Sequence, residues 1–119
     1  MPNNIPLGSQ GETEAVNYLR TQGYRIIERN FKKRYGEIDI IAIDGDTLAF
    51  VEVKTRIGDS HGKPVEAITP WKLTSLTRSA EYYKVLHPEL PDPMRIDFVG
   101  VTFDKGGTPE IELIKNITG

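Results

Sequence analysis

Short stretches rich in β-branched and aromatic residues recur along the chain and predict β-strands. They cover residues 24–31, 37–43, 47–55, 94–103 and 110–117. Only the turn sequence DGD separates the second stretch from the third, so we expect these two to form a hairpin. The pattern therefore predicts a sheet of five strands.

A helical pattern precedes the first strand. Apolar residues stand three, four and seven positions after Glu12, so they share one helix face with it. Ser9 followed by Glu12 is typical of a capping box, which predicts that the helix opens there, and Gly23 is expected to close it. Residues 1–8, which include two Pro, two Asn and one Gly, predict a loose arm.

A second helix is predicted from Thr69, as N-cap, through Pro70 at its first position to about His87. Residues 57–69 show little periodicity and predict a flexible loop. The element order is therefore α-β-β-β-α-β-β. Because the second helix stands between the third and fourth strands, it can serve as a crossover, and we expect one α/β domain with a mixed sheet flanked by helices.

Polar side chains on the two hairpin strands point to chemistry. If Gly45 and Asp46 are the central residues of a type II′ turn, Asp39 lies opposite Glu52. Side chains two residues apart share one face of a strand, so the charged residues of both strands gather on the same face.

The same register places Glu37 opposite Lys54 on that face. A type I′ turn centred one residue earlier is the alternative, in which Glu37 faces Glu52 and Asp39 becomes a diagonal neighbour of Glu52. In both registers, carboxylates and an ammonium group converge.

Carboxylates placed directly opposite each other across an antiparallel pair, with Cβ atoms about 5 Å apart, destabilise a sheet unless something compensates. Mg²⁺ prefers oxygen ligands, keeps several waters and often holds substrate phosphate, so Asp39, Glu52 and a strand carbonyl would suit it. The simpler interpretation is a partly buried ion-pair network in which Lys54 is the counter-ion of Glu37. Glu12 also has a simpler interpretation, as a capping side chain.

Composition narrows the classes of protein that fit. The chain has 119 residues and no cysteine, which excludes thiolate zinc sites, iron–sulfur clusters and a cysteine nucleophile. Neither a signal sequence nor a membrane-spanning stretch is visible, so we expect a cytoplasmic protein with no membrane partner. The formal net charge is −2, so a nucleic-acid partner must be recognised by local charge, as between Arg20 and Arg34, where six bases accompany one acid.

The succession of a helix acid, a strand with Asp39 and a strand with Glu-Val-Lys resembles the PD-(D/E)xK nuclease superfamily, and within it the YraN family. Nearly the whole chain takes part, and archaeal Holliday-junction resolvases are similar over the core. Ile38 stands where the superfamily motif has its nominal proline. The residues that carry the resemblance are Gly11-Glu12, Ala15, Tyr18-Leu19, Gly23-Tyr24, Asn30, residues 36–42 (GEIDIIA), residues 51–56 (VEVKTR), Pro64, Glu66-Ala67-Ile68, Lys72, Arg95 and Asp97.

The resemblance implies a restriction-endonuclease-like core and Mg²⁺-dependent hydrolysis of phosphodiester bonds in DNA, with branched or structured DNA among the substrates. Asp39 and Glu52 would ligate Mg²⁺, for which Mn²⁺ could substitute, and the Val53 carbonyl would add a ligand. Lys54 would orient or activate the attacking water, and Glu12 would complete the site from the helix. This chemistry needs neither histidine nor cysteine.

Basic residues around the hairpin and the loop after it are candidates for contacts with the phosphate backbone. Tyr35 and Trp71 are either base-stacking or packing residues. Asp97 is expected to be a hydrogen-bonding acid beside the core rather than a member of the site. The basic candidates are Lys32, Lys33, Arg34, Arg56, Lys63 and Lys72.

Two other classes of function fit the same sequence. One is a nucleic-acid-binding module without catalysis, and the other is a protein-interaction adaptor, which suits the net charge of −2. Loss of Mg²⁺ binding in Asp39→Ala would separate the enzyme from the binding module, and salt-dependent DNA binding would separate the adaptor from both. A homodimer and a recruiting protein partner are compatible with the sequence.

Overall fold

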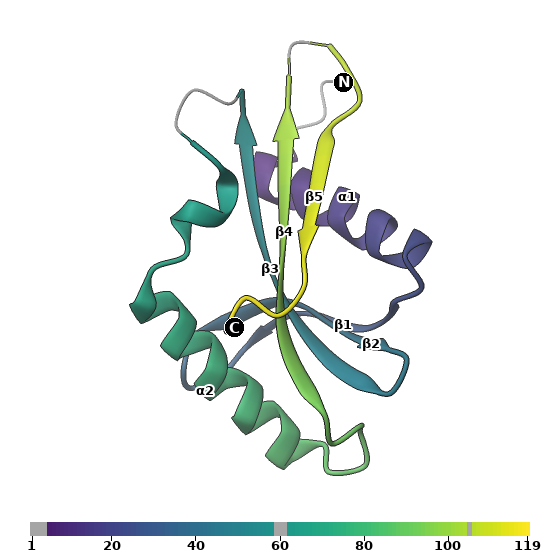
Figure 1. Cartoon of the computed structure of the whole chain (residues 1–119), viewed down its shortest axis with the longest axis vertical. Helices are drawn as coiled ribbons and strands as arrows, with labels where there is room; N and C mark the ends of the chain where they lie inside the picture. Colours follow the sequence, from purple (N-terminus) through teal and green to yellow (C-terminus); the bar gives the residue numbers. More distant parts are fainter. Residues whose placement is uncertain (1–4, 59–61, 105) are drawn as a thin grey trace.

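The chain forms a five-stranded sheet with one helix on each face (Figure 1). The computed structural model describes residues 5–58, 62–104 and 106–119. The order confirms the predicted α-β-β-β-α-β-β succession and adds a short 3₁₀ helix, η1. The elements are α1 (Leu7–Thr21), β1 (Arg25–Lys32), β2 (Glu37–Asp44), β3 (Thr47–Ile57), η1 (Pro64–Ala67), α2 (Pro70–Leu86), β4 (Met94–Phe103) and β5 (Glu110–Ile114).

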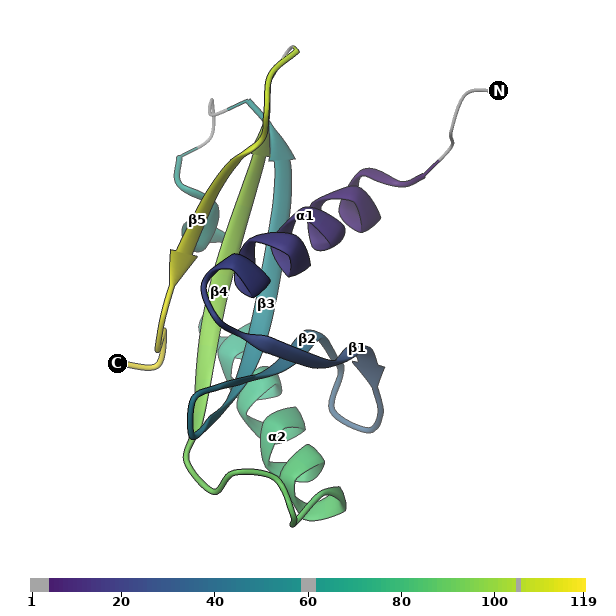
Figure 2. The ribbon, with the colours of Figure 1, turned by 90° about the vertical axis from the view of Figure 1, so that its right-hand side faces the viewer.

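The strands lie in their chain order, β1-β2-β3-β4-β5. Only β3 and β4 run parallel, and α2 is the crossover that joins them. The other neighbours are antiparallel, which confirms the predicted mixed sheet of an α/β domain. β1 and β2 cross the direction of β3 and β4 (Figure 2), so the sheet is strongly twisted.

Each face of the sheet carries its own apolar core. α1 covers one face through Ala15, Val16 and Leu19, which pack with Tyr24, Ile40, Ala42, Ala49, Val51, Val99 and Val101. α2 covers the other face through Leu76, Ala80 and Tyr83, which pack with Phe31, Ile38, Ile41, Leu48, Phe50 and Ile96. None of the helices in the described part of the chain has the length and apolarity that a membrane crossing requires.

α1 begins earlier than the sequence predicts. Ser9 lies inside this helix, and none of the described side chains caps its first turn, so the predicted capping box is wrong. The Glu12 carboxylate accepts hydrogen bonds from β1 instead. The predicted arm is helical from Leu7 onward, and residues 1–4 lie outside the described residues.

The predicted flexible loop over residues 57–69 is partly wrong. β3 continues through Ile57, and η1 occupies four residues of the expected loop. Pro64 at the first position of η1 fixes a helical φ, and Glu66 Oε1 accepts the Lys63 N–H at 3.2 Å. Residues 59–61 of the predicted loop lie outside the described residues.

β5 is shorter than its predicted extent to residue 117. It ends at Ile114, because Asn116 has a left-handed backbone with φ 59°. The Asn116 N–H donates to Asp97 Oδ1 at 2.9 Å, outside the strand pairing.

Candidate active site

The β2–β3 hairpin sets the positions of both predicted carboxylates. Ile41 pairs with Phe50, which confirms the register with Gly45 and Asp46 at the centre of the turn. Gly45 has φ 64°, as the first central position of a type II′ turn requires. The alternative register is therefore wrong.

Strand pairing in the hairpin stops at Ile40–Val51, just before Asp39. Asp39 Oδ2 instead accepts the backbone N–H of Val53 at 2.8 Å. The predicted pair of directly opposed acids is thus replaced by a carboxylate that reaches across to the backbone of β3.

β1 is also irregular beside Asp39. The β1–β2 register passes over Asn30 and Asp39, although the residues on either side of them pair. Asn30 has φ 57°, which is uncommon for a residue other than glycine. Ile38 packs in the core under α2 and Ile40 in the core under α1, so the predicted strict alternation along β2 is wrong at Asp39.

Asp39 and Glu52 are two acids in a partly dry environment. Glu52 is only 9% exposed. Burial raises the pKa of Asp39 to about 7, the negative charge of Glu52 adds to the rise, and the hydrogen bond from Val53 opposes it. Proximity of two carboxylates makes it costly for both to be ionised, so Asp39 shares its site with a proton near neutral pH.

Glu52 is incompletely satisfied. Its Oε2 lies 3.2 Å from Lys72 Nζ of α2. With both acids ionised, its buried Oε1 has no hydrogen-bond partner within residues 5–58, 62–104 and 106–119. A proton held by Asp39 is shared with Glu52 through a side-chain hydrogen bond, which also raises the pKa of Asp39. A buried carboxylate oxygen without a partner is costly. An oxygen-rich position beside a second carboxylate fits a hard divalent cation, which would supply the missing partner.

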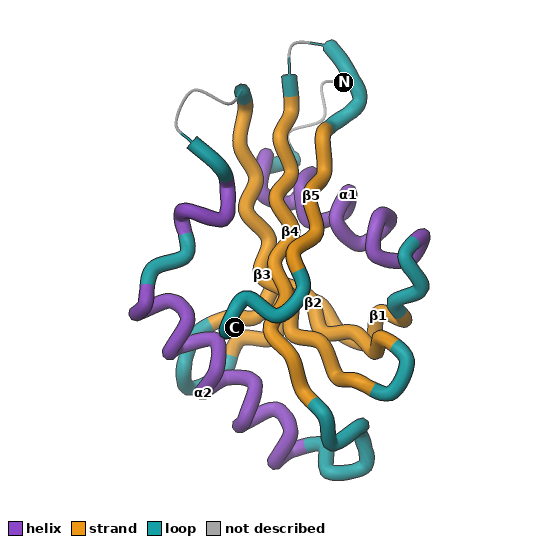
Figure 3. Tube along the Cα trace, viewed as in Figure 1, coloured by secondary structure: helices purple, strands orange, loops and turns teal. Residues whose placement is uncertain are grey.

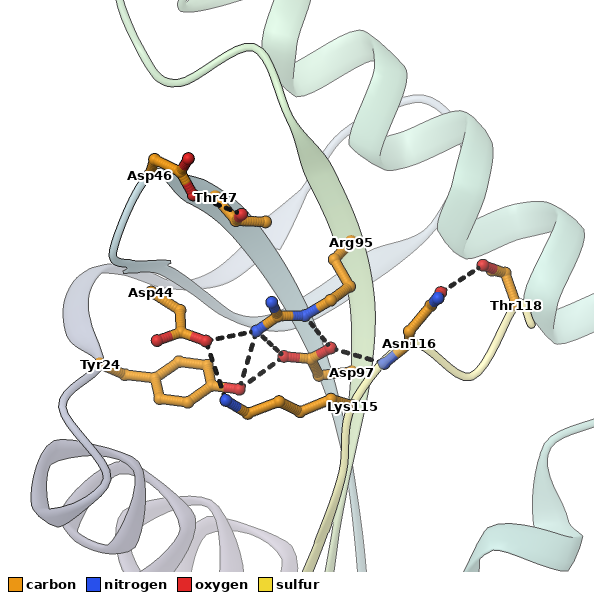
Figure 4. A network of polar contacts seen from close by, with 9 residues as sticks. All are labelled: Tyr24, Asp44, Asp46, Thr47, Arg95, Asp97, Lys115, Asn116 and Thr118. Atoms are coloured by element: carbon orange, nitrogen blue, oxygen red, sulfur yellow. Dashed lines mark hydrogen bonds and ion pairs between the residues drawn. The ribbon is translucent and has the colours of Figure 1, made fainter.

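Both carboxylate oxygens of a second buried acid, Asp97, accept hydrogen bonds (Figure 4). Its Oδ1 accepts from Arg95 Nε at 2.8 Å and Asn116 N–H at 2.9 Å. Its Oδ2 accepts from Tyr24 Oη at 2.7 Å and Arg95 Nη2 at 2.9 Å. Arg95 also binds Asp44 at 2.7 Å, and this hydrogen bond lowers the pKa of Asp44. Asp97 is therefore the structural acid that the sequence predicts.

Glu12 lies at the wall of a cavity of about 420 Å³ that Asp39 and Lys54 also line. Its Oε1 accepts from Arg29 Nε and Asn30 Nδ2, both at 3.1 Å. In the part of the chain that the structure describes, no three Asp, Glu or His side chains gather closely enough to hold a metal together. A cation at Asp39 and Glu52 would need backbone, water or substrate oxygens to complete its ligands.

Two lysines approach the acids from different elements. Lys54 is exposed on β3 and lines the cavity with Asp39. The ion pairs of the described residues include none between Lys54 and Glu37, so the counter-ion interpretation finds no support. The sequence predicts Lys72 only as a phosphate contact. Its pairing with Glu52 depends on how α2 lies on the sheet, which no local sequence signal reveals.

The other basic candidates form two groups. Lys32, Lys33 and Arg34 are exposed in and beside the turn between β1 and β2. Arg56 and Lys63 line a separate cavity of about 760 Å³ beside η1. This cavity is less suited to phosphate than the turn, because four acids share its lining: Glu66, Asp104, Glu110 and Glu112.

Comparison with known proteins finds relatives along almost the whole chain. The model of a family described as "Uncharacterised protein family UPF0102" matches residues 11–101. A UPF0102 protein of Geobacter metallireducens is 44% identical over 113 residues, which is 95% of this chain and 92% of the relative. One from Clavibacter michiganensis is 41% identical over 110 residues, 92% of this chain and 93% of the relative. One from Mycobacterium avium is 43% identical over 115 residues, which is 95% of this chain and 90% of the relative.

Proposed function

Since the chain belongs to the UPF0102 family, we propose for it the function that its own site supports best, that of a Mg²⁺-dependent endonuclease hydrolysing phosphodiester bonds in DNA. UPF0102 is the YraN-like family, so this membership confirms the family that the sequence predicts. The PD-(D/E)xK superfamily, with its restriction-endonuclease-like core, is part of the proposal, as is a cytoplasmic location.

The observation that carries the proposal is the buried Oε1 of Glu52, which has no hydrogen-bond partner among the described residues when both acids are ionised. It lies beside a second carboxyl group whose pKa is raised by burial and by Glu52 itself. A protein that needed this acid only for folding would be expected to satisfy it, as this one does with Asp97. Buried acids with perturbed pKa values in a cavity are typical of functional sites.

Asp39 and Glu52 would hold the cation, with the Val53 carbonyl as a third protein ligand. Mg²⁺ suits these oxygen donors, and Mn²⁺ would substitute for it. When bound, the cation would polarise the phosphate and lower the pKa of a coordinated water. The hydrogen bond from the Val53 N–H to Asp39 Oδ2 positions this carboxylate for its role.

Lys54 is the catalytic candidate among the lysines. Its side chain is exposed and lines the cavity with Asp39, so its ammonium group can reach a phosphate bound there. It would orient the attacking water and stabilise the negative charge that develops on the nonbridging oxygens. Glu12, which also lines this cavity and is held by Arg29 and Asn30, is the candidate third carboxylate.

Lys72 would pair with Glu52 in the free protein and with a phosphate when DNA is bound. In the protein without DNA it neutralises Glu52 across 3.2 Å. With DNA bound, a phosphate would offer the same ammonium group a second anion. Lys32, Lys33 and Arg34 would position the duplex backbone without reading its sequence, which favours recognition by shape, as in branched DNA.

The test is cleavage of linear, single-stranded, flapped and four-way-junction DNA with Mg²⁺ or Mn²⁺. Cleavage that requires metal and falls at least about a hundredfold in Lys54→Ala and Glu52→Gln is expected. Asp46→Asn, which changes an exposed carboxyl group in the β2–β3 turn, is the matched control and should cleave like the wild type. No cleavage by a folded protein that binds DNA would refute the nuclease.

A nucleic-acid-binding module without catalysis is the second candidate. The engagement of Glu12 by two β1 side chains favours it, because the third carboxylate is then occupied. This candidate predicts salt-dependent DNA binding that is unchanged in Glu52→Gln and needs no divalent cation. A protein-interaction adaptor would bind no DNA at any salt concentration.

A further inference from the structure

The turn between β1 and β2 lies against α2 (Figure 3), and together they form a small hollow on the surface. We call it the aromatic hollow. Its volume is about 360 Å³, at the small end of the range for ligand pockets. Its lining residues are Tyr35, Arg78, Glu81, Tyr82 and Val85.

Two tyrosine rings and a guanidinium group are arranged in and beside the hollow. Tyr35 and Tyr82 meet edge to face, with ring centroids 6.1 Å apart. The guanidinium carbon of Arg34 lies 5.7 Å from the Tyr35 ring and 5.6 Å from the Tyr82 ring. Tyr35 is 39% exposed and Val85 is 73% exposed. The rings therefore present apolar and π surface to solvent.

A left-handed backbone conformation and a hydrogen bond from α2 hold the turn in this arrangement. Arg34 has φ 55°, a left-handed conformation that a residue other than glycine adopts at a cost. The Ser75 hydroxyl of α2 donates a hydrogen bond to the Tyr35 carbonyl oxygen. The aromatic hollow is thus preorganised by α2 rather than left to a free loop.

Few residues separate the aromatic hollow from Asp39 along the chain that leads into β2, and from the Glu52 partner Lys72 along α2. Tyr35 precedes Asp39 by four residues, which span at most about 13 Å. Tyr82 follows Lys72 by ten residues of α2, about 15 Å of helix. These lengths correspond to about four nucleotides of a stacked strand, whose rise is about 3.4 Å per nucleotide, and to fewer of an extended one.

Aromatic rings with a neighbouring guanidinium group bind nucleobases by stacking, and flanking lysines bind the adjacent phosphates. Lys32 and Lys33 supply this flanking charge at the turn, and Arg78 supplies it on α2. Glu81 is the single acid among the described residues that line the hollow. A base inside a duplex is already stacked and paired, so only an unpaired base can enter the hollow.

We propose that the aromatic hollow binds one unpaired base of a DNA strand whose backbone continues to the carboxylate pair. This inference rests on the proposed function, because it names the substrate class of that site: DNA with unpaired nucleotides next to the duplex, as in a fork, flap or open junction.

Binding without metal tests the hollow separately from cleavage. Fluorescence anisotropy in EDTA would compare a forked duplex with a fully paired duplex of the same length. The wild type is expected to bind the fork about tenfold more tightly, as one stacked base provides. Tyr35→Leu and Arg34→Gly should lose this preference. Glycine fits the left-handed backbone at position 34, so a loss in Arg34→Gly does not reflect strain.

Tyr18→Leu is the matched control. Tyr18 lies on α1 and is not among the residues that line the hollow, so this variant should keep the full preference for the fork. A 2-aminopurine at the unpaired position should lose fluorescence on binding to the wild type and keep it with Tyr35→Leu.

Equal binding of fork and duplex by the wild type would overturn the proposal, as would an equal loss in Tyr18→Leu and Tyr35→Leu. Absence of DNA binding would overturn it too and would point to a protein partner. A retained preference in a protein that cleaves no DNA would refute the nuclease and leave the hollow as a base-binding site.

Discussion

Asp39 experiences opposing influences on a single carboxyl group. The Val53 N–H favours its ionised form, whereas burial and Glu52 favour the protonated form and outweigh it, so the pKa rises from 3.8 to about 7. Between these pH values the folded protein keeps a proton that the unfolded chain has lost. The free energy of unfolding should therefore fall as the pH rises from about 4 to about 7.

Asp39→Asn should remove this pH dependence. Asparagine still offers an oxygen to the Val53 N–H but carries no charge beside Glu52. We expect its free energy of unfolding at pH 8 to exceed that of the wild type by about 1 to 2 kcal/mol, with a smaller difference at pH 5. Urea denaturation at both pH values measures this. Asp46→Asn, in the exposed turn, should keep the slope of the wild type, and a wild-type slope in Asp39→Asn would contradict the assignment.

Lys72→Met should strengthen the binding of a divalent cation by the free protein. Lys72 occupies Glu52 Oε2 at 3.2 Å, so a cation must compete with its ammonium group. Removal of the ammonium group should increase Mn²⁺ affinity by about three- to tenfold in calorimetric titration. Lys63→Met, in the separate cavity beside η1, should leave the affinity unchanged. Weaker Mn²⁺ binding in Lys72→Met would show that Lys72 supports the cation instead of opposing it.

Among the elements, α1 lies unusually close to β3. A Cβ atom at Gly11 would come within 3 Å of the Thr55 side chain, so only glycine fits there. Glu12 follows directly in the chain. The close approach of α1 to β3 therefore places Glu12 at the wall of the cavity that Asp39 lines.

Gly11→Ala should separate α1 from β3. Alanine is the better helix former by about 1 kcal/mol, but the clash with Thr55 should outweigh this and give a net loss of about 1 to 3 kcal/mol in unfolding free energy. Gly8→Ala is the control in the same helix, because its Cβ would meet open space, and it should be neutral or stabilising. Thr55→Ala should recover part of the loss in the double variant. Equal effects of Gly8→Ala and Gly11→Ala would contradict the close packing.

The parts of the fold that local patterns determine could be predicted from the sequence. Gly45 with Asp46 fixes the β2–β3 register, because few two-residue turns match the strand twist. Thr69 starts α2 as predicted, since its side chain accepts the Lys72 N–H at 3.1 Å. The crossover through α2 then requires β3 and β4 to be parallel.

The contacts around the site could not be predicted, because they depend on tertiary packing. Ser9 and Glu12 have the spacing of a capping box, but Glu12 forms hydrogen bonds with Arg29 and Asn30 of β1. Asn30 has a left-handed backbone, and the strand pairing beside Asp39 is interrupted there. The surrounding sequence is typical of a β-strand and does not clearly indicate this interruption. Asparagine's tolerance of positive φ is the one signal that could have suggested it.

Across the whole molecule, the buried acids Asp97 and Glu52 differ in how fully their carboxylate oxygens are hydrogen-bonded. Asp97 is fully satisfied and ties Tyr24, β4 and the residues after β5 into one network. Glu52, when ionised together with Asp39, keeps an oxygen for which the described part of the chain offers no hydrogen-bond partner. Natural proteins accept such local instability where a function needs it, so the two acids should respond in opposite ways to neutralisation.

Asp97→Asn should lower the free energy of unfolding by about 2 to 3 kcal/mol, because it removes one of the two anionic partners of Arg95 and replaces an oxygen that accepts hydrogen bonds with an amide that donates them. Glu52→Gln removes a charge that is itself under-satisfied, so it should be within about 1 kcal/mol of the wild type or more stable. Paired denaturation curves at pH 7 measure both. A loss in Glu52→Gln as large as that in Asp97→Asn would make Glu52 a structural acid.

The binding of Mn²⁺ to the free protein tests most directly whether Asp39 and Glu52 form a metal centre. Calorimetry at pH 8, where Asp39 is mostly ionised, should find one site in the wild type and in Asp46→Asn. Asp39→Asn and Glu52→Gln should each weaken that site by at least about tenfold. A Mn²⁺ site that survives in both variants, or no site in the wild type, would contradict the assignment.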